Sequence, residues 1–578
     1  MAESSRTSLI RRMFLWLHRP AIAAGSGVLL SLAYAPAGQG WVVWLWMIFL
    51  LGIIWNTDGP RRGWKGFGLG WTAGAAFFLF NLSWLATVSI LAQITLACVM
   101  ALYFGLWGAF AATLGSPRRR DIDGGDAPDG CCRAWLSSFA CAAVWCGTEW
   151  LRGNLFGGFG WNGLGVALQN HIHISQAADI AGVTGLAFLP VFVQCAAVRA
   201  LRRARADGWR ILRRADVISA VALVAGAWGY GHWRLRQLDS LPTFPVKALL
   251  VQLNIPQDAA KVLVPEEEVH QGYEEETAAA FAALAAKGET PDWLLWPESS
   301  LFGRLMRADN GSWGMWRENT ETIRRVKELG SFTLMLGLTE LEAEAQGDEL
   351  VMKDDAKCYN SLCVLSPAGE LQSFRKHHLV IFGETIPFLD SVPFLKKIYE
   401  QQSGAKYEGS YSSGVSFDPL HADAGGHTVG LIPTVCFEDT IGNLARKFAR
   451  GGPQVIVNAT NDGWFKESEA ADQHFANARF RAIELRRPML RCANSGVSAA
   501  VSAAGSVLRQ GLDVPQILTD ASGSHFTRGW KLVRVDVPLE PPFTLYAYAG
   551  DWIVIGLALA GCVAGWRLGK PVPPASVL

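Results

Sequence analysis

Long apolar runs constrain the fold of this chain more than any other feature of its sequence. Seven runs lie before about residue 235 and an eighth lies near the C-terminus. Each is close to the roughly 20 residues that a helix needs to cross a bilayer. One such run could be a buried helix of a soluble protein, but eight of them, several nearly free of charge, exclude that alternative. We predict spans at about 21–36, 40–56, 67–87, 88–114, 134–151, 178–200, 216–233 and 549–567.

Composition agrees with a membrane protein of more than one domain. Of the 578 residues 50% are hydrophobic, and 24 are tryptophan. The net charge of +1 gives no reason to expect a nucleic acid or an acidic partner. We predict a membrane domain at 1–238, an extracytoplasmic α/β domain at 239–545, and the eighth span with a short cytoplasmic tail at 546–578.

Arginine and lysine gather in alternate loops, which predicts the orientation of the spans. They occur at 1–19, 61–65, 118–120 and 199–214, whereas the intervening loops are nearly bare apart from Arg152. All basic loops then lie in the cytoplasm, and seven crossings place residues 234–548 on the outer side. No cleavable signal peptide is evident, because no small-residue cleavage site follows the first span.

Residues 245–545 alternate between short apolar runs and helical patterns. Near-continuous apolar strands predict an α/β domain whose sheets are buried on both faces. The expected strands are 246–253, 292–296, 333–338, 359–365, 428–435, 454–458, 489–493 and 497–501. The clearest expected helices are 266–286, 316–328 and 471–486.

Three reactive residue types, Glu298, Lys376 and Cys436, each follow a strand-like run. Taken singly, a cysteine is usually a small buried hydrophobe, and a glutamate or lysine is usually solvated. Together they suit cysteine acyl chemistry: the carboxylate takes the thiol proton, the thiolate attacks a carbonyl, and the ammonium holds the oxyanion. Lys376 beside a carboxylate should stay charged and favour the thiolate.

The other cysteines indicate neither a disulfide framework nor a metal site. In the α/β domain only Cys358, Cys363 and Cys492 accompany Cys436. We assign no Cys358–Cys363 bridge, because a separation of five along a strand places the side chains on opposite faces. None has zinc-ligand spacing with histidine, and we assign no metal and no cofactor. The histidines, His474 among them, show no triad pattern and are interpreted as structural.

The segments around the three residues resemble the carbon–nitrogen hydrolase (nitrilase) superfamily, whose members use a Glu–Lys–Cys triad. The matching segments are Trp296-Pro-Glu-Ser299, Lys376-His-His-Leu-Val-Ile-Phe-Gly-Glu384, Cys436-Phe-Glu438, Asn458-Ala-Thr-Asn-Asp-Gly-Trp-Phe465, Gln473-His-Phe475 and Arg481-Ala-Ile-Glu-Leu-Arg-Arg-Pro488. The resemblance implies a four-layer α-β-β-α sandwich with Glu298, Lys376 and Cys436 as catalytic residues. The backbone N–H of Phe437 would share the oxyanion with Lys376. By the same resemblance Glu384 and Glu438 position Lys376 and its loop; surface charge is the alternative for these two.

A nitrilase-like domain between a seventh and an eighth span is similar to one branch, the apolipoprotein N-acyltransferase family. The matching segments are Leu32-Ala-Tyr-Ala-Pro36, Ser83-Trp84, Thr148-Glu-Trp-Leu-Arg-Gly153, Gly158-Phe-Gly-Trp161 and Val251-Gln-Leu-Asn-Ile-Pro-Gln257. The chain departs from the family at Gly160 and Ile381, where proline is usual, at Phe437, where tyrosine is common, and at Leu253, where glycine is common. None of these departures removes a triad member.

The family resemblance implies an acyl transfer at the bacterial inner membrane, with the α/β domain on the periplasmic side. The donor would be a phospholipid, typically phosphatidylethanolamine, and the acceptor the N-terminal amine of a diacylglyceryl apolipoprotein, with a cysteine thioester between them. Two alternatives stay open. One is a membrane-tethered nitrilase-type amidase, and the other is an inactive scaffold or lipid-binding relative, against which the intact triad argues.

Four aromatic residues are candidates for substrate contact, each with a structural alternative. Phe388 lies in the apolar stretch 386–395, which could be a lid over lipid or could pack on the sandwich. Trp464 and Phe465 could line an acyl channel or belong to an aromatic core. Trp161 could contact the headgroup or belong to the interfacial aromatic belt.

Overall fold

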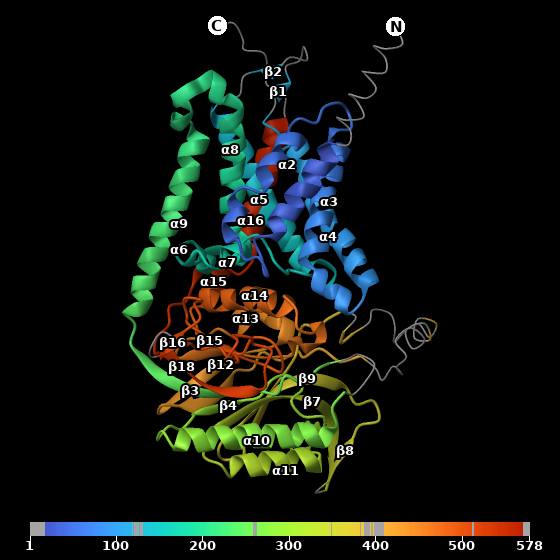
Figure 1. Cartoon of the computed structure of the whole chain (residues 1–578), viewed down its shortest axis with the longest axis vertical. Coiled ribbons are helices and arrows are strands. Elements are labelled where there is room, and N and C mark those ends of the chain that lie inside the picture. The colour runs from blue at the N-terminus through green and yellow to red at the C-terminus, as the bar shows by residue number, and fades with distance from the viewer. Residues whose placement is uncertain are drawn as a thin grey trace. The chain divides into compact units, whose positions relative to one another are not determined.

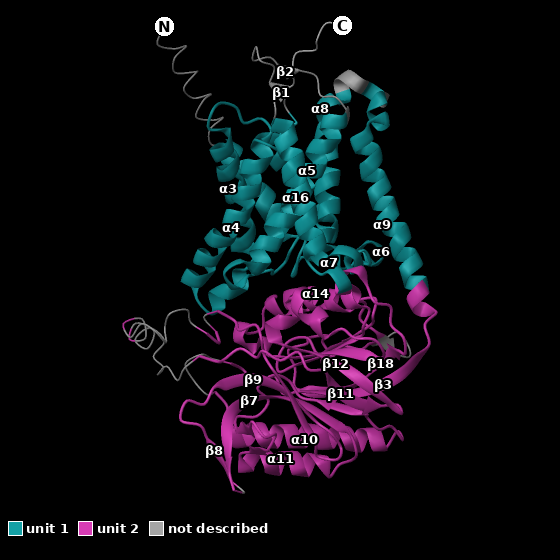
Figure 2. Ribbon diagram, turned by 180° about the vertical axis from the view of Figure 1, so that it is seen from behind, with its two compact units in different colours: residues 1–236, 548–578 teal, residues 237–547 magenta. Residues whose placement is uncertain are grey.

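The chain forms two compact units, a helical one and a mixed α/β one. The first comprises Met1–Arg236 and Tyr548–Leu578, and the second comprises Gln237–Ala547 (Figure 2). The computed structural model describes residues 18–117, 119–120, 126–127, 131–257, 263–347, 349–381, 383–385, 394, 397, 410–510 and 514–569.

Helical structure occurs in all eight regions predicted to span the membrane (Figure 1). The helices are residues 18–31, η1 (Gly40–Trp44) with α2 (Met47–Ile54), α3 (Arg62–Asn81), α4 (Ile90–Ala112), α5 (Cys131–Asn154), α7 (Ala178–Leu186) with α8 (Phe188–Asp207), α9 (Ala215–Asp239) and α16 (Trp552–Gly569). Among the described residues, α4 and α16 are long and apolar enough to cross a membrane. A third candidate is α7 with α8, which are bent by 55° relative to each other.

The other described helices are too polar or too short to qualify as membrane spans, and their sequences show why. Charged side chains such as Lys65 and several glycines lower the hydropathy of α3. Helix α5 contains Glu149 and Arg152, and α9 contains charged residues at both ends. Residues 40–56, predicted as one span, are divided into η1 and α2 and do not form one helix of membrane length.

Glycines bring α3 and α4 into backbone contact. A Cβ on Gly70 would lie 2.3 Å from the carbonyl oxygen of Phe104, and a Cβ on Gly108 would lie 2.4 Å from that of Gly66. Small residues at such positions let helix backbones approach closely, a common way for membrane helices to associate. Any larger side chain at Gly70 or Gly108 would push the two helices apart.

Two β-sheets form the centre of the α/β unit. In the first, the main strand order is β10 (Leu371–Arg375), β9 (Cys358–Leu365), β7 (Thr333–Gln346), β4 (Trp293–Leu295), β3 (Thr243–Gln252) and β18 (Gly529–Pro538). The strands β5 (Arg304–Ala308), β6 (Trp313–Met315) and β8 (Glu349–Met352) extend it beside β7. The second sheet has the order β11 (Leu420–Ala424), β12 (His427–Val435), β13 (Gln454–Thr460), β14 (Met489–Ala493) and β15 (Ala499–Val501). Two small two-stranded sheets are β1 (Arg119–Arg120) with β2 (Asp126–Ala127) and β16 (Arg509–Gln510) with β17 (Val514–Pro515).

The side-chain alternation of β3 shows how the layers are stacked. Successive strand residues point to opposite faces. Val246, Ala248 and Leu250 therefore enter a core shared with the second sheet, whereas Leu249 and Val251 pack under the helices α10 (Glu266–Ala285) and α11 (Arg317–Lys327). The helices α13 (Gly442–Ala445) and α14 (Ala470–Leu485) lie on the opposite side of the stacked sheets (Figure 1). The layer order is thus helices, sheet, sheet, helices.

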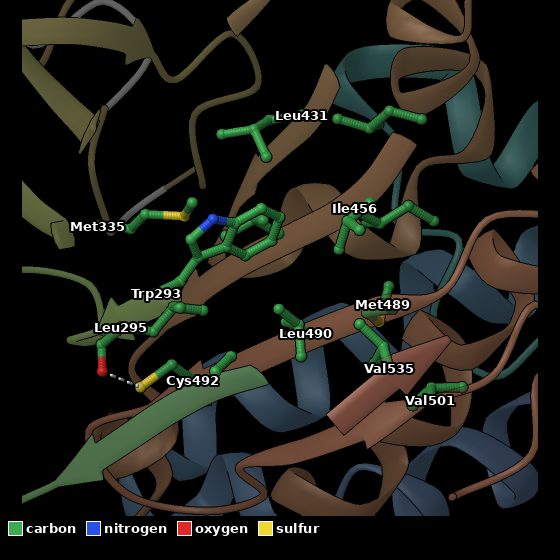
Figure 3. Close-up of a cluster of buried hydrophobic side chains, with 14 of the residues drawn as sticks. Trp293, Leu295, Met335, Leu431, Ile456, Met489, Leu490, Cys492, Val501 and Val535 are labelled. Atoms are coloured by element: carbon green, nitrogen blue, oxygen red, sulfur yellow. Dashed lines mark hydrogen bonds between the residues drawn. The ribbon is translucent and has the colours of Figure 1, made fainter. Parts of the chain in front are cut away.

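Large apolar side chains from both sheets fill the space between them (Figure 3). Trp293 and Met335 come from the first sheet, and Leu431 and Ile456 come from the second; all four are at most 1% exposed. The thiol of Cys492 in this core donates to the Leu295 carbonyl oxygen at 3.3 Å. This dry, close-packed centre fixes the two sheets relative to each other.

The parallel strands of each sheet end at the same edge, and the candidate site residues follow these strand ends. In the second sheet β12, β13 and β14 are adjacent and parallel, and in the first sheet β3, β4 and β7 are. The carboxyl ends of parallel strands meet at the same edge, which is where α/β folds place their sites. Glu298 follows β4, Cys436 follows β12, and Asp462 follows β13.

Candidate active site

Glu298, Lys376 and Cys436 meet in a buried cluster of the α/β unit. Glu298 and Lys376 lie just beyond β4 and β10, and Cys436 opens the 3₁₀ turn η6 (Cys436–Thr440) at the end of β12. Lys376 Nζ is 3.6 Å from Glu298 Oε1, and the Cys436 thiol is near enough to both residues for Glu298 to raise its pKa and Lys376 to lower it. Lys376 is fully buried and Glu298 is 7% exposed. The structure therefore brings the three predicted residues together.

The backbone of Cys436 is held in an uncommon conformation. Its φ is 50°, in the left-handed region that residues other than glycine seldom adopt. Such conformations persist only where the surroundings enforce them, and they are frequent at active sites. Here the Cys436 carbonyl oxygen accepts a hydrogen bond from Asn458 Nδ2 at 3.3 Å. The thiol is thus presented at a sharp turn that ends a buried strand.

Glu384 completes the surroundings of the lysine. Its Oε2 lies 2.8 Å from Lys376 Nζ and accepts a hydrogen bond from the backbone N–H of Val380 at 2.9 Å. Lys376 is therefore placed between two carboxylates, those of Glu298 and Glu384. A buried ammonium needs such partners, because an isolated charge in the interior is costly.

Glu438 joins the lysine loop to the cysteine turn. Its Oε1 accepts the backbone N–H groups of His377 and His378 at 2.7 and 2.9 Å, and its Oε2 accepts that of Val435 at 2.9 Å. The side chain is fully buried. Burial raises its pKa to about 7, although Lys376 and these three hydrogen bonds favour the ionised form. Glu438 is thus an internal connector and not a surface charge.

Asn360 is a member of the cluster that the sequence reasoning missed. From β9, its Nδ2 donates to Glu298 Oε1 and to Glu384 Oε1, both at 2.7 Å. The residue was included in the predicted strand 359–365 without a role. The signal that could have found it is an amide inside a mostly apolar strand, because a buried amide needs hydrogen-bond partners.

The pKa values of the three groups are shifted by burial and by one another. Burial raises the pKa of Glu298 above its usual range, although Lys376 lowers it. Burial lowers the pKa of Lys376, but Glu298 and Glu384 raise it more, so the amine stays charged. Burial also raises the pKa of Cys436 far above the usual value, and Lys376 only partly opposes this rise. Lys376 therefore stays charged and favours the thiolate, as expected, but burial and Glu298 outweigh its effect, so the resting group is a thiol.

The remaining predicted site residues differ in their placement. Phe437 is half-buried in η6, with its ring 5.9 Å from that of His378. Trp464 is 45% exposed and Phe465 is half-buried in the turn η8 (Asp462–Phe465). Phe388 lies outside the described residues, as does most of the stretch 386–395.

Trp161 belongs to the helical unit and is only 2% exposed. Its ring stacks on Phe159 and tilts against Trp84, with centroid distances of 6.0 and 5.5 Å. Arg152 Nη1 donates to the carbonyl oxygens of Phe159 and Trp161 at 3.0 and 2.7 Å. In this structure Trp161 is therefore a buried anchor of its loop.

Two family models match the chain. Residues 26–196 match the apolipoprotein N-acyltransferase N-terminal domain, and residues 247–519 match the carbon–nitrogen hydrolase domain. An apolipoprotein N-acyltransferase of Geobacter metallireducens is 29% identical over 84% of this chain and 85% of its own. That of Rhodopseudomonas palustris is 29% identical over 92% of each chain, and that of Rhizobium rhizogenes is 27% identical over 93% and 94%. Among solved structures, an amidase of the nitrilase superfamily from Nesterenkonia covers 52% of this chain and 93% of its own, at 16% identity and a TM-score of 0.31.

The α/β unit and its matching family model define an enzyme of the nitrilase superfamily. The N-terminal part of the chain identifies the branch of this superfamily, because residues 26–196 match the apolipoprotein N-acyltransferase N-terminal domain. The relative from Rhodopseudomonas palustris that has this name matches over 92% of each chain. The chain belongs to the apolipoprotein N-acyltransferase family and is a membrane protein, with two or three candidate transmembrane helices in the part of the chain that the structure describes.

Proposed function

We propose that this chain transfers a fatty acyl group from a membrane phospholipid, phosphatidylethanolamine in the first instance, to the N-terminal amine of a diacylglyceryl-modified apolipoprotein. The observation that carries the proposal is the buried cluster of Glu298, Lys376 and Cys436 inside a carbon–nitrogen hydrolase domain. The N-terminal domain in the same chain, and relatives named for this reaction, support the choice of substrates.

In the first half-reaction Cys436 Sγ attacks the carbonyl carbon of the phospholipid ester while Glu298 takes the thiol proton. Because the pKa of the thiol is raised, proton transfer accompanies the attack and does not precede it. Glu298 Oε2 suits this role, since within the described residues it accepts no well-directed hydrogen bond that would compete. The ester C–O bond then breaks, the proton passes from Glu298 to the leaving oxygen, and a lysophospholipid departs from the thioester.

In the second half-reaction the lipoprotein amine attacks the thioester carbonyl. Glu298 takes a proton from the amine as the C–N bond forms, the C–S bond breaks, and the proton returns to sulfur. Lys376 Nζ and the backbone N–H of Phe437 hold the oxyanion in both steps. Loss of one oxyanion donor typically costs about 2.7–4 kcal/mol of barrier, so Lys376→Ala should slow both half-reactions by about 100- to 1000-fold.

The surrounding residues position these groups. Asn360 and Glu384 fix Glu298 and Lys376, and Glu438 keeps the lysine loop against the cysteine turn. The exposed Trp464 contacts the acyl chain in this proposal, with Phe465 beside it. Phe388 is proposed as a further contact of the same chain.

Membrane placement completes the proposal. Eight spans, with the basic loops in the cytoplasm of a bacterial inner membrane, would put the α/β unit on the periplasmic side. Both substrates are anchored in the outer leaflet there, so a tethered enzyme meets them at a raised effective concentration. A soluble substrate would require no such tether.

The test is intact-mass measurement of the full-length protein after incubation with phosphatidylethanolamine. We expect one added acyl group, which Cys436→Ala abolishes. Cys492→Ala is the matched control, because Cys492 is a buried thiol bonded to the Val251 and Leu295 carbonyl oxygens and should keep the adduct on Cys436.

A diacylglyceryl-cysteine peptide added next should remove the acyl group and gain it on its N-terminal amine. Release of free fatty acid with no acylated peptide would indicate the amidase alternative, since water would then replace the amine. Normal turnover by Cys436→Ala would end the covalent mechanism altogether.

A further inference from the structure

A closed ring of four charged side chains lies directly behind the cysteine turn. Asp439 belongs to η6, Asp462 opens η8, His474 comes from α14 and Arg491 comes from β14. All four are at most 2% exposed. The proposed chemistry uses none of them, yet two of them lie on the turns that follow β12 and β13.

The geometry of the ring determines the charge of the histidine. His474 Nε2 lies 2.8 Å from Asp439 Oδ1, and its Nδ1 lies 2.7 Å from Asp462 Oδ1. Nδ1 also lies 3.1 Å from Arg491 Nη2, which can only donate. An ionised carboxylate only accepts hydrogen bonds, so the imidazolium, which donates from both ring nitrogens, is the form that satisfies both aspartates. Arg491 closes the ring through Asp439 Oδ2 and through Asp462 Oδ2, the latter at 2.9 Å. Two anions and two cations therefore balance in the interior.

The ring is connected to the nucleophile along two short paths. Asp439 is three residues from Cys436 within η6. Arg491 Nη1 also donates to Asn458 Oδ1 at 3.1 Å, and Asn458 Nδ2 donates to the Cys436 carbonyl oxygen at 3.3 Å. The ring thus holds the turn from which Cys436 presents its thiol with a φ of 50°.

We propose that His474 is a positioning residue, which holds Asp439 and Asp462 with its imidazolium and so keeps the Cys436 thiol directed at Glu298. The proposal rests on the thioester mechanism above, with Cys436 as nucleophile. Because Asp462 begins the turn that carries Trp464 and Phe465, the same imidazolium ties that turn to the nucleophile. If His474 loses its charge, Arg491 is the one cation of the ring that still pairs with both Asp439 and Asp462.

The positive charge of His474 is lost at high pH, and the experiment can use this loss. Burial lowers its pKa, but Asp439 and Asp462 raise it more, against the opposing charge of Arg491, to about 9. The folded-state pKa is above the usual 6.5, so the stabilising imidazolium persists at neutral pH and is lost as the pH rises through about 9. The pKa values of Lys376 and Cys436 lie well above this range, so they do not obscure the change.

The experiment compares the full-length wild type with His474→Gln in single-turnover formation of the acyl adduct on Cys436, from pH 7 to pH 10. We expect the maximal rate of the variant to be about 10- to 100-fold lower, as misplacement of a reacting group produces. The half-saturating phospholipid concentration should not change. The wild-type rate should fall above about pH 9, and the variant should lack that fall.

His270→Gln is the matched control, because His270 is also a buried histidine but pairs with Thr322 between α10 and α11. It should behave as wild type. An unchanged maximal rate and pH profile in His474→Gln would overturn the proposal, and so would a rise in half-saturating concentration alone.

Two further measurements keep the test decisive. If His474→Gln does not fold, His474→Gln with Asp462→Asn restores the charge balance of the ring and should recover folded protein with the same slow rate. Alkylation of Cys436 by iodoacetamide does not depend on the acyl substrate. If the wild type forms no acyl adduct but its alkylation shows the same dependence on His474 and pH, the proposed function fails while the positioning role stands.

Discussion

One amide nitrogen joins Glu298 to Glu384, the second carboxylate beside Lys376. Asn360 Nδ2 donates to Glu298 and to Glu384, so the two carboxylates next to Lys376 share a neutral anchor on a rigid strand. Hydrogen bonds to charged groups contribute about 1.5–3 kcal/mol each. The orientation of Glu298 therefore depends on Asn360 as well as on the lysine.

We expect Asn360→Ala to lower the rate of thioester formation by about 10- to 100-fold, because Glu298 loses the donor that aims it. The rate is measured by single-turnover mass spectrometry of the Cys436 adduct. Asn443→Ala serves as the control, since Asn443 lies in α13, outside the cluster, where it accepts a hydrogen bond from Arg446. A wild-type rate in Asn360→Ala would show that the lysine alone orients the base.

At this scale the sequence identified the residues that stand out from their surroundings. Glu298, Lys376 and Cys436 each interrupt or end an apolar run, and the structure brings them together. Asn360 was missed because its role does not follow from any local spacing in the sequence. It depends on strand pairing, which places β9 beside β7. The raised pKa of Cys436 was missed too, because burial is a property of the folded chain.

The packing of α3 on α4 depends on which face of α3 each glycine occupies. Gly70 faces the Phe104 carbonyl oxygen at a distance that admits no side chain, whereas a Cβ on Gly68 would meet nothing within 4 Å. Gly68 has room for a larger side chain and Gly70 does not, although nothing in the local sequence distinguishes the two glycines.

Gly70→Leu should destabilise the helical unit by about 1–3 kcal/mol, because overpacking against backbone cannot relax easily. That corresponds to a fall in Tm of about 2–10 °C, measured on the full-length protein in detergent. Gly68→Leu should leave Tm unchanged or slightly higher, since leucine is the better helix former. Equal effects of the two substitutions would contradict the packing described.

Periodicity predicted the central strands of both sheets and the three longest helices of the α/β unit. All eight expected strands are present, and 489–493 coincides with β14; β7 extends further than expected, to Gln346. The strands that were not predicted are β5, β6, β8, β10, β11, β16, β17 and β18. In the second half of β18, Arg534 and Asp536 alternate with buried valines, and the strand pairs with β3 along its whole length. In the helical unit the sequence located the helices but not the break between η1 and α2.

For the whole molecule, the testable property is the side of the membrane on which the α/β unit lies. If the basic loops share the cytoplasm, a reporter fused after residue 233 should lie outside and one fused after residue 570 inside. Cysteine labelling gives the matched pair: Ser522→Cys, on an exposed turn of the α/β unit, and Arg210→Cys, between α8 and α9.

In intact spheroplasts a membrane-impermeant maleimide should label Ser522→Cys, whereas Arg210→Cys should react only after lysis. The opposite pattern would place the α/β unit in the cytoplasm, away from the outer-leaflet substrates, and would make the proposed reaction untenable.

The pairing of β3 with β18 sets the order in which the α/β unit can be completed during synthesis. The two strands match along their whole length, with Thr243 opposite Pro538 and Gln252 opposite Gly529. The ribosome makes β3 long before β18. The edge of β3 that pairs with β18 therefore stays open while nearly all of the α/β unit is being made. Open edges recruit foreign strands. The nascent chain therefore has to be shielded until its last strand arrives, only a short distance ahead of α16, and closure of the sheet becomes a late step of biogenesis.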